Sequence, residues 1–267
     1  MRSPSRDPWA KLARWTPARI ALGRTGASLP TREVLAFALA HARARDAVHA
    51  PFDPGAVSRG LARLGLDTIE VASDATDRAL YLRRPDCGRR LSPASRKALG
   101  DRRRPVDLAL VVGDGLSATA VHAHAIPLIA AFQPHARRQD LSLAPVVLAR
   151  GARVALGDEI GAALQARAVA VLIGERPGLS SSDSLGVYLT FGPRHGRSDA
   201  ERNCISNSRA EGLSYEVAAF KLAWLVREAL SRSLTGVGLK DASELTLRDG
   251  TSSVAPGIMP APVPGQR

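Results

Sequence analysis

Cysteine, aromatic residues and long apolar runs are all scarce in this 267-residue chain, and each shortage excludes a class of protein. The two cysteines, Cys87 and Cys204, have no partners at metal-ligand spacing, so neither a disulfide framework nor a zinc site is expected. No window approaches the about 18 uninterrupted apolar residues of a membrane span, and the polar start lacks the apolar core of a secretory signal. We therefore expect a soluble, cytoplasmic protein.

Arginine supplies most of an excess positive charge that is unevenly distributed along the chain. The formal net charge is +12, and only four of the 37 basic residues are lysine. Residues 1–104 contain 21 Lys and Arg against 10 Asp and Glu, whereas residues 105–267 contain 16 against 15. Such a charge is typical of nucleic-acid-binding proteins, but these also use aromatic side chains for base stacking, and aromatics make up only 4% of the chain. A nucleic-acid-binding module in the basic segment stays open as an alternative.

The first hundred residues favour helices and loops. Residues 7–19 carry spaced apolar side chains interrupted by proline and are interpreted as a short docking arm. Apolar residues at helical spacing predict a core-facing helix over about 31–48, with Phe37 in the core. A second amphipathic helix is predicted over about 56–64 and a further short element over 73–83.

From residue 105 the pattern changes to alternating strands and helices. Strands are predicted over 106–112, 146–149, 168–173 and 186–191, and helices over 118–132, 158–167 and 215–233. This alternation predicts an α/β fold with a Rossmann-like, doubly wound, mostly parallel sheet, preceded by a smaller helical, Arg-rich N-terminal region. The expected domains are a helical docking extension over 1–104, the Rossmann-like domain over 105–245 and a Pro-rich tail over 246–267.

Ligands of doubly wound sheets lie beyond the carboxyl ends of the strands, so the residues that follow the strands are the candidate site. Residues 113–118 match the G-x-G-x-x-G/A pattern, but no acidic residue follows about 20 positions later. A tight turn is therefore favoured over a dinucleotide site, with a Rossmann-type nicotinamide oxidoreductase left open as an alternative. Glu175 could accept hydrogen bonds from a ligand or pair with Arg176 at the surface, and the amide-rich segment 202–209 suits contact with a polar ligand or a partner chain.

Several segments together resemble the small subunit of ethanolamine ammonia-lyase. These are Asp107–Ala118, Arg153–Gly161, Ile173–Ser181 and Glu201–Asn207, helped by Arg19–Gly26, and the resemblance runs from about Arg14 to Lys240. It implies a light chain that packs beside a large barrel subunit and binds adenosylcobalamin with its Rossmann-like domain. The cofactor contacts of that family fall at positions that match Val154, Glu175 and Cys204, and the resemblance implies no catalytic residue and no metal ligand in this chain.

The resemblance also implies a reaction and an assembly. The complex of small and large subunits converts ethanolamine to acetaldehyde and ammonia by radical chemistry that the cofactor supplies. A hetero-oligomer of several subunit pairs is expected, with no nucleic acid and no membrane, in the cytoplasm or inside a bacterial microcompartment. The basic segment is then interpreted as a surface that meets an acidic large subunit. The string D-x-H-x-x-G, which marks cobalamin proteins that displace the nucleotide base from cobalt, does not occur, and the family similarly binds the cofactor base-on.

Overall fold

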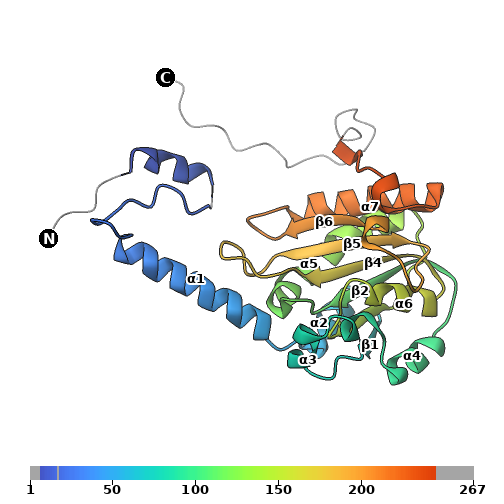
Figure 1. Cartoon of the computed structure of the whole chain (residues 1–267). Helices are drawn as coiled ribbons and strands as arrows, with labels where there is room; N and C mark the ends of the chain where they lie inside the picture. Colours follow the sequence, from blue (N-terminus) through green and yellow to red (C-terminus); the bar gives the residue numbers. More distant parts are fainter. Residues whose placement is uncertain (1–6, 17, 245–267) are drawn as a thin grey trace.

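Six strands form one sheet in the computed structural model, which describes residues 7–16 and 18–244. The strands are β1 (Thr68–Ala72), β2 (Val106–Gly113), β3 (Val146–Arg150), β4 (Ala166–Gly174), β5 (Leu185–Phe191) and β6 (Asn203–Ser208). Their order is β1-β3-β2-β4-β5-β6, with parallel pairing from β1 to β4 and antiparallel pairing of β5 with β4 and with β6 (Figure 1). The predicted α/β fold with a mostly parallel sheet is confirmed.

Helices cover both faces of the sheet, and each face has its own apolar core. One core contains residues of α2 (Pro54–Ala62), α5 (Ala118–Arg138) and α7 (Tyr215–Arg232), and the other contains residues of α4 (Pro93–Gly100) and α6 (Leu156–Ala163). Besides α1 (Thr31–His49), which is described below, the residues that the structure describes also form the short helix α3 (Arg78–Arg83) and the 3-10 helices η1 (Pro8–Trp15), η2 (Cys87–Arg89), η3 (Asp199–Glu201) and η4 (Gly236–Gly238). None of the helices in the part of the chain that the structure describes is long and apolar enough to cross a membrane.

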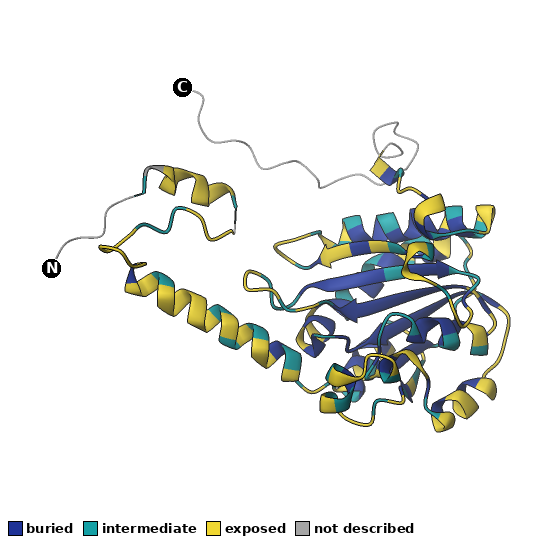
Figure 2. Cartoon of the chain, viewed as in Figure 1, coloured by how far each residue is buried: buried dark blue, intermediate teal, exposed yellow. Residues whose placement is uncertain are grey.

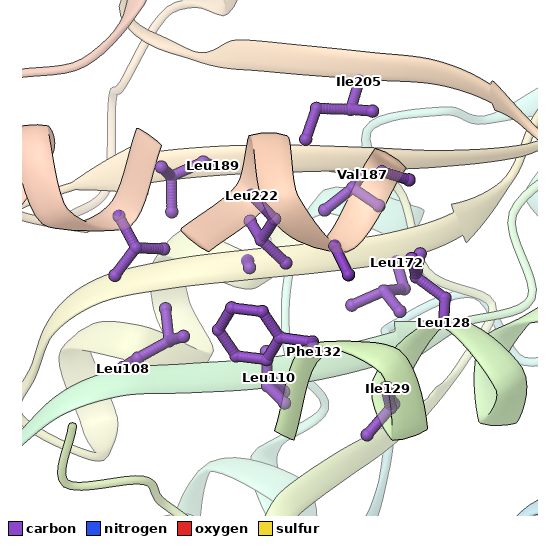
Figure 3. Packing of buried hydrophobic residues seen from close by; sticks show 14 of the residues in the cluster. Leu108, Leu110, Leu128, Ile129, Phe132, Leu172, Val187, Leu189, Ile205 and Leu222 are labelled. Atoms are coloured by element: carbon purple, nitrogen blue, oxygen red, sulfur yellow. The ribbon is translucent and has the colours of Figure 1, made fainter. Parts of the chain in front are cut away.

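The central strand β2 shows why this sequence forms a buried parallel sheet. Leu108 and Leu110 alternate with Ala109 and Val111, so one set packs under α5 and α7 while the other packs toward α6. Figure 3 shows Phe132 of α5 lying over this strand within the first core. Apolar side chains at successive positions are what burial on both faces requires, and an almost wholly apolar run, interrupted by Asp107, is the pattern from which the strand was predicted.

The chain reverses its direction of progress across the sheet between β2 and β4. From β2, α5 leads to β3 on one side, and from β3 the chain crosses by α6 to β4 on the other side of β2. Without the edge strand β1, the strands follow the 2-1-3-4-5 order of flavodoxin-like sheets, and not the 3-2-1-4-5-6 order of the dinucleotide-binding Rossmann fold. The carboxyl ends of β2 and β4 lie side by side, with Gly113 opposite Ile173, at the point where the strand order reverses. Ligands of such sheets bind at this switch point.

The N-terminal segment is less purely helical than predicted. Residues 68–72 form β1, which pairs in parallel with β3 from Thr68 opposite Val146 to Ala72 opposite Arg150. The prediction of helices and loops over the first hundred residues did not include this strand, because an edge strand needs little apolar sequence. In β1 only Val71 is fully buried.

Helix α1 (Thr31–His49) forms over the predicted residues but does not pack as predicted. Its only buried residue is Ala47, while Leu35 and Phe37 are 64% and 48% exposed. Figure 1 shows α1 extending away from the sheet, and Figure 2 shows it exposed along most of its length. The prediction that Phe37 lies in the core was wrong, because helical spacing predicts an apolar face without specifying which chain covers it.

Some helix boundaries differ from the predicted ones, and of the two predicted terminal segments only the first contains described residues. Helix α5 continues six residues past Phe132, and α6 ends at Ala163, because Gln165 takes a left-handed conformation (φ +56°) and β4 begins at Ala166. Of the predicted docking arm, residues 8–15 form the 3-10 helix η1, in which residues 9–15 are exposed. The predicted Pro-rich tail, 246–267, lies outside the described residues.

Candidate functional site

A pocket of about 340 Å³ opens at the switch point of the sheet, beyond the carboxyl ends of β2 and β4. Its lining consists of Tyr81, Gly115, Leu116, Arg153, Val154, Ile173, Gly174, Glu175, Arg176 and Tyr188. Two of the three predicted contact residues, Val154 and Glu175, line it directly. The third, Cys204, lies on β6 directly opposite Tyr188. A larger hollow of about 710 Å³ lies between α1 and residues 178–183, but the switch point singles out the smaller pocket.

The turn that follows β2 is held by the side chain of Asp114. Its Oδ1 accepts hydrogen bonds from the backbone N–H groups of Gly115 at 3.0 Å and Ala152 at 2.9 Å, and burial raises the pKa of this carboxyl. Gly115 has φ +56°, and a Cβ there would lie 2.3 Å from the carbonyl oxygen of Gly174. The G-x-G-x-x-A segment therefore makes a tight turn that ties β2 to β3 and β4, which was the favoured interpretation of the sequence.

The carboxylate of Glu175 is oriented by one hydroxyl group from β6 and one from the loop that precedes β5. Ser206 of β6 donates to Oε1 at 2.6 Å, Ser184 donates to Oε2, and the backbone N–H of Asn207 donates to Oε2 at 3.4 Å. Gly186 makes room for it, because a Cβ there would lie 2.8 Å from Oε1. Within residues 18–244, no cation lies at ion-pair distance from Glu175. The alternative of a surface pair with Arg176 was therefore wrong.

The loop that carries Ser184 is anchored by a buried histidine of α5. His124 Nε2 lies 3.2 Å from Asp183 Oδ2, and its Nδ1 lies 2.8 Å from the hydroxyl of Tyr215. A carboxylate only accepts, so we assign the proton to Nε2, and Nδ1 then accepts from the tyrosine. Ser117 adds a second anchor, because its hydroxyl donates to the carbonyl of Ser182 at 3.0 Å.

Val154 lies in the turn between β3 and α6, where it gives the pocket a partly buried apolar wall. The preceding residue, Arg153, is fixed at its backbone by a 2.8 Å hydrogen bond to the carbonyl of Gly88. Its guanidinium lies 4.1 Å from the centre of the Tyr81 ring, and the hydroxyl of Tyr81 donates to the carbonyl of Ala152 at 3.0 Å. These contacts with α3 and η2, which lie far away in the sequence, therefore hold the turn in place.

Cys204 and Tyr188 face each other on neighbouring strands at the edge of the pocket. Desolvation by the surrounding chain raises the pKa of the Cys204 thiol, although part of its surface is exposed. Burial also raises the pKa of Tyr188. Both groups are therefore neutral near pH 7, which suits packing against a ligand better than nucleophilic or general-base catalysis.

A buried ion pair fixes α6, the helix that follows the Val154 turn, relative to β6, the strand that carries Cys204. Arg202, just before β6, donates from Nη1 and Nη2 to the two carboxylate oxygens of Asp158 in α6, both at 2.7 Å. The two side chains are 2% and 3% exposed. A bidentate pair of this kind is short and strongly directional, so it fixes both position and orientation.

Sequence reasoning missed several of the residues that build this pocket. Tyr81 and Arg153 meet only because α3 folds against the β3–α6 turn, and no local pattern indicates that contact. The segment 202–209 contains β6 (Asn203–Ser208), and the sequence did not indicate that its Ser206 orients Glu175. The predicted contact of this segment with a polar ligand or a partner chain stays a prediction. Among residues 7–16 and 18–244, no group of three or more His, Cys, Asp or Glu side chains could hold a metal ion.

Comparison with known proteins gives a consistent result over most of the chain. The family model described as "Ethanolamine ammonia-lyase light chain (EutC)" matches residues 6–240. A protein of Azotobacter vinelandii named "Ethanolamine ammonia-lyase small subunit" is 56% identical over 257 residues, covering 94% of this chain and 95% of its own length. Proteins with the same name from Bradyrhizobium diazoefficiens and Pseudomonas fluorescens are 58% and 55% identical, covering 92% and 90% of this chain and 96% and 88% of their own lengths. The chain therefore belongs to the ethanolamine ammonia-lyase light-chain family.

Proposed function

We propose that this chain is the small subunit of an adenosylcobalamin-dependent ethanolamine ammonia-lyase and that its pocket binds one edge of the corrin cofactor at the interface with the large subunit. The assembled enzyme converts ethanolamine to acetaldehyde and ammonia. Bound adenosylcobalamin supplies the radical chemistry, and the substrate site belongs to the large subunit. The observation that carries the proposal is the oriented carboxylate of Glu175 at the switch point, with Val154 and Cys204 beside it.

The donor and acceptor groups of the pocket suit a corrin. The rim of a corrin ring carries carboxamide side chains, whose N–H groups need acceptors, around an apolar macrocycle. A carboxylate has about four acceptor positions, and donors among the described residues use three on Glu175, two of them on Oε2. The remaining position on Oε1 can accept from a ligand amide, while Leu116 and Val154 offer apolar contact.

The size of the pocket supports a shared binding site. Pockets that enclose a drug-sized ligand measure about 300–1,000 Å³. A corrin with its nucleotide tail is much larger than such a ligand, so a pocket of about 340 Å³ covers only part of it. A second protein surface must cover the remainder, and we assign that role to the large subunit.

The exposed N-terminal elements support a partner of substantial size. Helix α1 and turn η1 expose Leu35, Phe37, Trp9 and Trp15 to solvent, the two tryptophans by 67% and 68%. Helices in proteins are stabilised mainly by packing of an apolar face, and α1 packs little of its own within this chain. We propose that the large subunit covers these elements, and that hetero-oligomers of several such subunit pairs form.

Reconstitution from separate subunits tests the proposal. This chain and the large subunit from the same genome are purified separately, and acetaldehyde formation from ethanolamine is measured with adenosylcobalamin present. Neither subunit alone should be active, and mixing the two should restore activity. Lyase activity of this chain alone, or inactivity of a stable complex with bound cofactor, would contradict the assignment.

A further inference from the structure

Arg153 is a cation on the wall of the pocket that has no carboxylate partner. Its Nη2 donates to the carbonyl of Tyr81 at 3.1 Å, and its Nε is buried without any acceptor. Within residues 7–16 and 18–244, no carboxylate lies at ion-pair distance from it. The guanidinium is nevertheless fixed, because it stacks 4.1 Å from the centre of the Tyr81 ring.

A second arginine over the same ring, Arg78, has a carboxylate partner and serves as a comparison. The Arg78 guanidinium lies 4.7 Å from the centre of the Tyr81 ring. It lies 3.6 Å from the carboxylate of Asp114 and donates to the carbonyls of Gly115 and Val48, both at 2.7 Å. The described residues therefore supply a counter-charge for Arg78 and none for Arg153.

An unpaired, partly buried guanidinium is costly in the free protein and becomes favourable when an anion reaches it. Arginine suits phosphate in particular, because its planar group donates two parallel hydrogen bonds to two phosphate oxygens. The stacking on Tyr81 holds that group in place beforehand, so little conformational entropy is lost on binding. The pocket thus has an acceptor side at Glu175 and a cationic side at Arg153.

We infer that Arg153 binds the phosphodiester of the nucleotide tail of adenosylcobalamin, an inference that rests on the proposed function. The phosphodiester is the anionic group of that tail, and in the base-on form the tail folds back toward cobalt. The phosphodiester therefore stays close to the rim of the ring, whose amide N–H groups donate to Glu175 in the proposed function. The same pocket can then contact both parts of one ligand.

Two corrins separate this role from a merely structural one. Cyanocobalamin carries the phosphodiester, and dicyanocobinamide lacks the whole nucleotide tail. Each is titrated into the assembled complex of this chain with the large subunit, and the dissociation constant is measured by calorimetry or by the change in the visible spectrum. Arg153→Met should weaken cyanocobalamin binding about 10- to 100-fold, the range expected for lost hydrogen bonds to a charged group, and leave dicyanocobinamide binding unchanged.

Further variants control for charge and for folding. Arg150→Met removes a positive charge three residues away, at a side chain that pairs with Glu70 and lies outside the pocket lining, and it should change neither constant. Arg153→Lys keeps the charge but loses the planar fork, so it should weaken cyanocobalamin selectively and less than Arg153→Met. If Arg153→Met lowers the thermal midpoint of the chain strongly, the lysine variant decides the question.

The possible outcomes are distinct. Equal weakening of both corrins by the Arg153 variants, or no weakening of either, would overturn the inference. If Glu175→Ala weakens both corrins while the Arg153 variants weaken neither, the proposed function stands and the inference fails. If the wild-type complex binds neither corrin, the proposed function fails as well.

Discussion

Removal of the Asp158 carboxylate tests the ion pair that joins α6 to the start of β6. In Asp158→Ala the Arg202 guanidinium stays buried, since it is 2% exposed in the wild type. The Thr190 hydroxyl at 2.9 Å, the Arg197 carbonyl at 3.0 Å and the exposed Asp199 carboxylate, 3.4 Å from Nε, remain as acceptors, and none of them replaces the buried bidentate carboxylate. Loss of one partner of such a pair costs about 3–5 kcal/mol. For a chain of this size about 1 kcal/mol corresponds to about 2–4 °C, so we expect the thermal midpoint to fall by about 6–20 °C.

The assay is thermal unfolding at neutral pH, followed by circular dichroism, for four proteins: wild type, Asp158→Ala, Arg202→Met and the double variant. The double variant should be more stable than the sum of the single effects predicts, because it leaves no unpaired charge in the core. A midpoint for Asp158→Ala within about 2 °C of the wild type would refute the reasoning, since it would mean that solvent or another group compensates Arg202. Strict additivity in the double variant would refute it as well.

Two further predictions concern pH and the turn after β2. The backbone N–H of Ser198, helped by the guanidinium of Arg197, lowers the pKa of Glu201 to about 2, so its stabilising effect is present above the ordinary glutamate pKa and lost as the pH falls toward 2. Urea unfolding at about pH 7 and about pH 3 should therefore show a smaller pH-dependent loss for Glu201→Gln than for the wild type, and equal losses would contradict this. Gly115→Ala should cost more stability than Gly65→Ala, because both have positive φ but only at Gly115 does a Cβ meet other atoms, 2.3 Å from the Gly174 carbonyl. Equal costs, each of about 1–2 kcal/mol, would show that the close approach does not matter.

Local sequence predicted those parts of the fold whose cause is local. The continuous apolar run of β2 requires burial on both faces, and the glycine-containing segment after it requires a tight turn, so both were predictable. The position of Glu175 at a strand end was also predictable, because the apolar run of β4 ends directly before it. The predictions that failed concern features that depend on residues distant in the sequence. The strand β1 exists because β3 offers an open edge, and the apolar face of α1 needs a surface that residues 7–16 and 18–244 do not supply.

The candidate site shows the same division. The family resemblance indicated Val154, Glu175 and Cys204, and the α/β pattern placed the first two at strand ends. The groups that orient them were not predictable, because Ser206 reaches Glu175 only through the pairing of β5 with β6. Tyr81 likewise meets Arg153 only through the docking of α3. Strand register and helix docking depend on contacts between distant segments, so local sequence patterns do not predict them.

The central claim is that Glu175 binds the corrin within the assembled enzyme, and a cobalamin titration of one variant tests it most directly. Adenosylcobalamin is titrated into complexes that contain wild-type chain, Glu175→Ala or the control Glu211→Ala, whose carboxylate is 77% exposed and lies outside the pocket lining. Loss of a hydrogen bond to a charged group is worth about 1.5–3 kcal/mol, so the dissociation constant should rise about 10- to 100-fold for Glu175→Ala and stay unchanged for the control. An unchanged constant for Glu175→Ala would contradict the account and remove Glu175 from the cofactor site.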